Sequence, residues 1–189
     1  MTILKAFLKF TDEAALIGRM LAGYADLEVN LMHCTQVVRD DLDTVLKVMF
    51  RTRGETQRID VAVALGRQHY RDLDLGTQYE MAVGAVRYCL RIRNQYAHCI
   101  WWDDNSGQLA FANLEEVAKE NERLVNLKGL TVHYVDIPLL QSQLAYFEYA
   151  DSLLKWTNWE GRARAGKQTI PNRIAPVQIE QPSLYIRKG

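Results

Sequence analysis

Hydrophobic side chains recur every third or fourth residue along most of the chain, a spacing typical of helices packed on one face. The first such stretch covers about residues 11–38, where Thr11 can cap a helix and Asp12 and Glu13 suit its first turn. "RTRGET" and "DLDLGT" interrupt the pattern, and Thr77 is a plausible cap after the second break. The same spacing predicts further helices over 40–50, 55–73, 78–98 and from Pro138 to about 158.

The pattern changes after the fourth predicted helix. In "CIWWDDNSGQLAFANL", two apolar runs flank a cluster of turn-forming residues, which predicts a β-hairpin. Asn113 followed by Glu116 resembles a capping box for a short helix. "TVHYVDI", residues 131–137, is rich in β-branched and aromatic residues and can add a third strand. We therefore predict a mainly α fold with a small antiparallel β-hairpin or sheet after the fourth helix.

The length of 189 residues suits one domain with a sizeable core. We predict a single helical domain with a small β element over residues 1–159 and a tail over 160–189. The tail contains three prolines and six basic residues against two acidic ones, a net charge of +4 in a chain of zero formal charge. It is either a solvated, partly disordered extension or a basic arm that contacts nucleic acid or a partner subunit.

Two observations bear on location and cofactors. No apolar stretch approaches the roughly 20 residues that span a bilayer, and the N-terminus does not resemble a secretory signal, so we expect a cytoplasmic protein without a membrane partner. The odd number of cysteines, Cys34, Cys89 and Cys99, argues against a disulfide framework or a zinc cluster. We expect the cysteines to be small buried hydrophobes, and we expect neither a metal nor another cofactor.

The fourth predicted helix carries an arginine where an apolar residue is expected. On a helical wheel Arg93 falls within the apolar arc, where an unpaired guanidinium would be costly to bury. Glu28 has the same kind of position on the first helix, so the two can pair across packed helices. Alternatively both reach solvent at the rim of the arc, or Arg93 faces a cleft or a subunit interface. His98, near the helix end on the polar face, can cap a terminal carbonyl, and Asn94 can orient its ring.

"RNQYAH", residues 93–98, resembles the R-N-x-x-x-H form of the motif that marks HEPN domains, a helical superfamily. Arg93, Asn94 and His98 take its three positions. An apolar helix leads into the motif, Ala97 precedes the histidine, and a tryptophan-containing segment follows, as in related bacterial proteins. "YADLE", from Tyr24 to Glu28, resembles an acidic first-helix element found in some of them. The resemblance covers about residues 11–102.

The resemblance implies an α-helical bundle that forms a homodimer in which the motifs of two subunits meet in one cleft. Many such domains are metal-independent RNases of toxin–antitoxin, phage-defence or RNA-processing systems, and others are binding or assembly modules. We therefore expect a metal-independent endoribonuclease with RNA as substrate and a cognate antitoxin as a partner. The alternatives are a non-catalytic nucleic-acid-binding or protein-assembly module, and a helical interaction protein in which the motif arises by chance.

The residue types suit this chemistry. His98 titrates near neutrality and can move protons, and Arg93 can donate two hydrogen bonds to a phosphate in the transition state. Asn94 can orient the phosphate or the imidazole. Arg87 and Arg91 can attract the RNA backbone, or they are simply a solvated helix face. Because Arg93 and His98 are five residues apart, they differ by about 140° on a regular helix. This separation weakens a site within one subunit, but less so if the helix ends before His98 or if two motifs face each other across a dimer axis.

Overall fold

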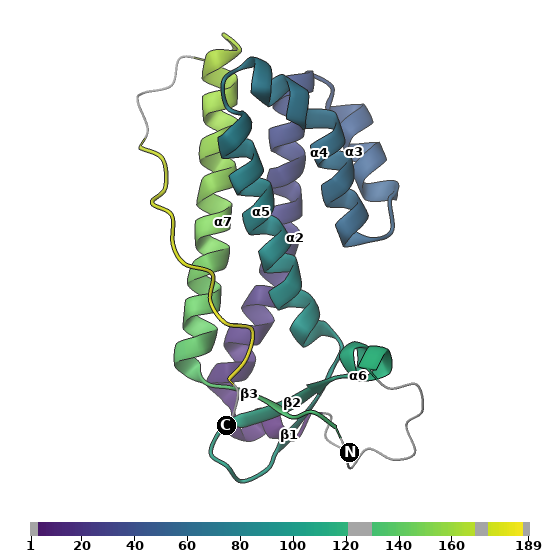
Figure 1. Ribbon diagram of the computed structural model, residues 1–189, viewed down its shortest axis with the longest axis vertical. Helices are drawn as coiled ribbons and strands as arrows, with labels where there is room; N and C mark the ends of the chain where they lie inside the picture. Colours follow the sequence, from purple (N-terminus) through teal and green to yellow (C-terminus); the bar gives the residue numbers. More distant parts are fainter. Residues whose placement is uncertain (1–3, 121–129, 169–173, 187–189) are drawn as a thin grey trace. The chain divides into compact units, whose positions relative to one another are not determined.

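The computed structural model describes residues 4–120, 130–168 and 174–186 (Figure 1). The chain is mainly α-helical, with a small antiparallel sheet after the fifth helix, as the sequence predicts. The described helices are α1 (Ala6–Lys9), α2 (Thr11–Arg39), α3 (Leu42–Arg51), α4 (Glu55–Asp72), α5 (Gly76–Ala97), α6 (Leu114–Glu120) and α7 (Ile137–Arg164). Within the described ranges, no helix is both long enough and apolar enough to span a bilayer.

The chain divides into two compact units, and each is described by itself. The bundle unit comprises Gly23–Leu90 and Tyr146–Glu180, which include most of α2, α5 and α7 and all of α3 and α4. The sheet unit comprises Met1–Ala22, Arg91–Ala145 and Gln181–Gly189. It includes α1, α6, the strands and the last residues of α5.

The bundle unit is held together by buried tyrosines that join its helices. The ring of Tyr70 in α4 stacks on Tyr79 in α5 with ring centroids 4.4 Å apart, and its hydroxyl donates to the Cys34 carbonyl in α2. The Tyr79 hydroxyl donates to the Ala62 carbonyl in α4. A Cβ at Gly66 would lie 2.8 Å from that hydroxyl, so only glycine allows this close approach of α4 and α5. These buried polar groups are satisfied by backbone carbonyls, which makes their burial tolerable.

The sheet unit is built around a three-stranded antiparallel sheet in the order β1-β2-β3. The strands are β1 (Cys99–Asp103), β2 (Leu109–Asn113) and β3 (His133–Val135). All five residues of the central strand β2 are buried, and its Phe111 lies against the rings of Tyr96 and Trp101. Asn105 and Gly107 have φ of 63° and 83°, the left-handed conformation that asparagine and glycine tolerate best in a hairpin turn.

The last described residues of the predicted tail lie on the sheet unit. The Ile186 N–H donates to the Tyr134 carbonyl in β3, and the Tyr185 ring lies 3.9 Å from the His133 ring. The Gln143 side chain in α7 donates to the carbonyls of Ser183 and Leu184. This end of the chain is therefore fixed to the protein by backbone, side-chain and aromatic contacts.

Three details differ from the sequence-based expectations. The short helix α1 has no counterpart among the predicted elements. Helix α5 begins at Gly76, before the predicted cap Thr77, because the Tyr79 N–H already donates to the Leu75 carbonyl. Helix α7 continues to Arg164, so the first residues assigned to the tail are helical.

Candidate functional site

The three motif residues lie at the end of α5, in the sheet unit. The helix ends at Ala97, so His98 is the first residue whose backbone departs from the helix. Its backbone is held by a hydrogen bond of 3.0 Å from the Leu114 N–H to the His98 carbonyl. The helix thus ends before His98, and a site shared by Arg93 and His98 stays a prediction.

Arg93 and Asn94 are both half-buried and contact each other. The Arg93 guanidinium donates through Nη1 to the Asn94 side-chain oxygen at 2.9 Å. The sequence suggested that Asn94 orients the phosphate or the imidazole, but its amide oxygen binds the guanidinium. Asn94 therefore restricts the orientation of Arg93, and its action on the imidazole or on a phosphate stays a prediction.

His98 has a carboxylate neighbour that the sequence did not reveal. Its Nε2 lies 3.5 Å from Oε1 of Glu115, near the start of α6. The second carboxylate oxygen of Glu115 lies 4.0 Å from Nζ of Lys119, one turn further along. About half of each of the His98 and Glu115 side chains is exposed, 49% and 51%. The imidazole is thus accessible to a ligand and has a carboxylate on one side.

One buried amide, that of Asn113, joins the end of α5 to the start of α6. Its Nδ2 donates to the carbonyls of Asn94 and Gln95 at 3.4 and 3.3 Å. Its Oδ1 accepts from the N–H groups of Glu115 and Glu116 at 2.9 and 3.3 Å. The amide can take only this orientation, because the opposite one would set its oxygen against two carbonyls. The sequence predicted the cap on α6 but not the link to α5.

The two arginines expected to bind the RNA backbone differ in their surroundings. Arg91 is exposed in the sheet unit, in the same helical segment as Arg93. Arg87 belongs to the bundle unit, where its guanidinium donates to Asp60 at 2.6 Å. The carboxylate neutralises much of the charge of Arg87, which weakens Arg87 as a candidate for phosphate binding.

Tyr24 and Glu28, the supporting residues expected from the resemblance, are buried in the bundle unit. Both carboxylate oxygens of Glu28 accept from Nη1 of Arg58, at 3.1 and 3.0 Å. Glu28 therefore has a cationic partner other than the predicted Arg93, and the Glu28–Arg93 contact stays a prediction. Arg58 could have been found from the sequence, because it lies one helical turn before Ala62, an apolar position of the predicted helix.

The cysteines have the environments expected of small core residues. Cys34 and Cys89 are buried, and Cys99 is half-buried. Desolvation raises the pKa of Cys34 and of Cys99 to about 12, and it also raises the pKa of Cys89. The thiols therefore stay protonated and weakly nucleophilic at neutral pH. The described part of the chain has no group of three or more His, Cys, Asp or Glu side chains placed to hold a metal ion.

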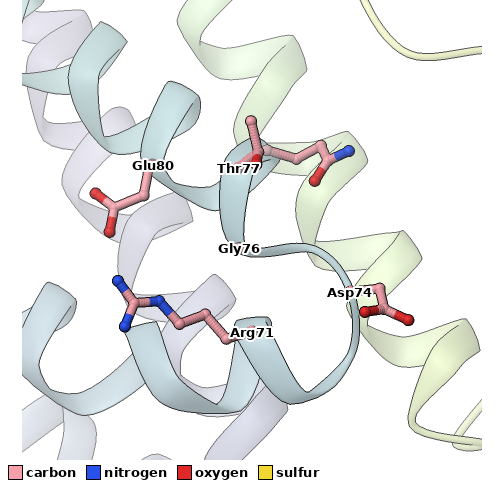
Figure 2. Close-up of a pocket in the computed structure, with 6 residues that line it drawn as sticks. Arg71, Asp74, Gly76, Thr77 and Glu80 are labelled. Carbon is pink, nitrogen blue, oxygen red and sulfur yellow. The ribbon is translucent and has the colours of Figure 1, made fainter.

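A pocket of about 560 Å³ lies elsewhere, at the junction of α4 and α5 in the bundle unit. Figure 2 shows the Arg71 guanidinium and the Glu80 carboxylate extending toward each other, with Asp74 on the connecting loop. The Glu80 carboxylate accepts a hydrogen bond from Arg67. With two carboxylates against one lining arginine, the pocket does not favour a phosphate. None of the predicted site residues lines it, so the end of α5 remains the candidate site.

Comparisons of the chain with protein-family models, with curated proteins and with solved structures find no match. The function is therefore argued from the side chains at the end of α5. These combine a titratable imidazole, a guanidinium held by an amide, and a carboxylate beside the imidazole.

Proposed function

We propose that the protein is a HEPN-like, metal-independent endoribonuclease that acts as a homodimer. The observation that carries this proposal is the end of α5, where Asn94 holds the Arg93 guanidinium and the exposed His98 stands just beyond the helix. The residues are those of the R-N-x-x-x-H motif. Their roles follow from what RNA cleavage requires of a protein.

Cleavage would proceed by attack of the ribose 2′-oxygen on the adjacent phosphorus. The 2′-hydroxyl proton passes to a base, the bond from phosphorus to the 5′-oxygen breaks, and the leaving oxygen takes a proton. The products are a 2′,3′-cyclic phosphate and a 5′-hydroxyl. His98 would act as the base or the acid, and Arg93 would donate to the phosphate oxygens as their charge increases. Arg91 would attract the flanking phosphates.

The homodimer supplies the second proton-transfer group. One imidazole starts the reaction as a base or as an acid but not as both, so a second His98 from another copy would complete the pair. A cleft formed by two motifs would also accommodate the position of Arg93 in the apolar arc of α5. We further propose that the RNase acts in the cytoplasm as the toxin of a toxin–antitoxin or defence system, with a cognate antitoxin as its partner.

The alternative is a non-catalytic module that binds nucleic acid or assembles with another protein. The carboxylates near the site favour it, because Glu115 lies beside His98 and Glu116 is next to it in α6. Negative charge at this position weakens attraction to a phosphate backbone. The arrangement of imidazole and guanidinium nevertheless favours the RNase.

Incubation of the purified protein with a structured RNA in the presence of excess EDTA tests the proposal. We expect cleavage by the wild type and a loss of 100-fold or more, on the order of the contribution of an acid–base group, for His98→Ala. Arg93→Ala should lose activity similarly. His69→Ala, which removes an exposed histidine of α4, is the matched control and should retain full activity.

Circular dichroism would verify that each variant is folded. A wild-type protein that binds RNA without cutting it would favour the alternative. If His98→Ala cleaves as fast as the wild type, the proposed active site is wrong.

A further inference from the structure

We infer that Glu115 is a positioning residue that fixes the ring orientation and the tautomer of His98. The inference rests on the proposed function, since it assigns a role in the same site. Its starting point is the distance of 3.5 Å between Nε2 of His98 and Oε1 of Glu115. An ionised carboxylate accepts hydrogen bonds only, so a ring nitrogen that bonds to it has to carry the proton.

This arrangement determines which nitrogen meets the substrate. In a neutral imidazole one nitrogen is a donor and the other is an acceptor. With the proton kept on Nε2 by Glu115, Nδ1 is the acceptor that can take a proton from the 2′-hydroxyl. A base oriented by a third group is a recurring device in enzymes that transfer protons.

The backbone around the pair is held in several places. The Leu114 N–H donates to the His98 carbonyl, and the next residue along is Glu115. The Asn113 side chain, in a residue only 5% exposed, bonds to the end of α5 and to the N–H of Glu115. Lys119 lies beside the other oxygen of the Glu115 carboxylate. The relative position of imidazole and carboxylate is thus set by the backbone as well as by their own attraction.

The pair itself contributes little to folding stability, because both side chains are about half exposed and water screens their interaction. Its removal should therefore leave the protein folded, and an effect on the reaction can be separated from an effect on the fold.

The same helical turn provides a matched control. Glu116 faces a different histidine, with Oε2 3.6 Å from Nε2 of His133. His133 is 8% exposed, and its ring packs between those of Phe111 and Tyr185, so it cannot reach a substrate as His98 can. Glu115→Ala and Glu116→Ala each remove one carboxylate from the first turn of α6. They differ in which histidine loses its partner.

The experiment combines ¹⁵N spectra of the imidazoles with cleavage kinetics in EDTA. The ¹⁵N shifts report which ring nitrogen carries the proton, and spectra of His98→Asn and His133→Asn assign the signals. We expect Glu115→Ala to move the His98 signals toward those of a mixture of tautomers, and Glu116→Ala to move only those of His133. Glu115→Ala should lower kcat about tenfold, part of the contribution of a general base, with KM unchanged within about twofold. Glu116→Ala should retain the wild-type kcat.

The outcomes separate the inference from the proposed function. If the ¹⁵N signals of His98 are the same in Glu115→Ala as in the wild type, the inference is overturned, whatever the rate of RNA cleavage. A normal kcat for Glu115→Ala in an active enzyme would also overturn it and leave the RNase proposal standing. If Glu115→Ala shifts the His98 signals but the wild-type protein cleaves no RNA, the contact is supported and the proposed function is overturned.

Discussion

Two carboxylates in the two units illustrate different uses of the same chemical group. Glu28 in the bundle unit has a side chain only 8% exposed and is paired with Arg58, itself 21% exposed. Glu115 in the sheet unit is half exposed and lies beside an equally exposed imidazole. Glu28 is closely paired because an isolated buried charge is very costly. Glu115 does not need a partner, because water solvates its exposed carboxylate.

The difference in exposure predicts which property each pair affects, folding stability or reactivity at the proposed site. Removing one partner of a buried pair leaves the other charge buried without a counterion, so the expected consequence is a loss of stability. Removing one partner of an exposed pair costs little stability, so any consequence appears in reactivity. Burial therefore predicts which measurement responds to each substitution.

The largest effect on stability is expected at the buried pair. Arg58→Met removes the guanidinium that binds both oxygens of Glu28, and we expect the free energy of unfolding to fall by about 3 kcal/mol. Urea denaturation monitored by circular dichroism measures it. Glu115→Ala is the counterpart at the exposed pair and should change stability by less than about 1 kcal/mol. Equal losses in the two variants would contradict the distinction between the pairs.

An intermediate effect is expected at Asn113, which supports the exposed pair from a buried position. Asn113→Ala removes the cap of α6 and both donations to the end of α5, and we expect a loss of about 2 kcal/mol. Asp41→Ala, which removes the exposed cap of α3, is the control and should cost less. The measurement is again urea denaturation. A loss at Asn113 no greater than that at Asp41 would mean that the amide does not join the two helix ends.

The smallest effect is expected at an exposed pair in the sheet unit. The hydrogen bond from Lys9 lowers the pKa of Asp103 below its ordinary value. A depressed pKa in the folded state adds stability above the unfolded pKa of about 3.9, and that stability is lost as the pH falls through the folded pKa. In Asp103→Asn the free energy of unfolding should therefore fall slightly less steeply than in the wild type as the pH is lowered from about 5 to about 2. Urea denaturation across this range tests it, and a steeper profile would contradict the assignment.

Much of the fold was accessible from the sequence, because helical spacing and turn chemistry are local properties. Thr11 marks the start of α2, the hairpin surrounds "DDNSG", and Asn113 caps α6 as predicted. The helix α1 was missed because four residues are too few to show a period. The contact of Ile186 with β3 was missed because pairing between distant segments leaves no local pattern.

The sequence suggested the residues of the candidate site but not their contacts. Arg93, Asn94 and His98 stand out through their spacing, while the identity of their neighbours depends on how other elements fold against them. Glu115 reaches His98 only because α6 begins where the hairpin returns to the end of α5. Arg58 in α4 contacts Glu28 in α2. A helical wheel is drawn for a single helix and cannot reveal a contact between two helices.

The most direct test of the central claim uses two RNAs of the same sequence that differ at one sugar. Once a cleavage position is mapped in EDTA, the ribose on its 5′ side is replaced by 2′-deoxyribose. If the 2′-hydroxyl is the nucleophile, cleavage of the modified RNA at that position should disappear. Cleavage of the unmodified RNA should leave a 2′,3′-cyclic phosphate. The His98→Ala variant should leave the unmodified RNA uncut. Equal cleavage of both RNAs, or a wild-type protein that gives no cleavage position to map, would contradict the assignment of Arg93, Asn94 and His98 to an RNase active site.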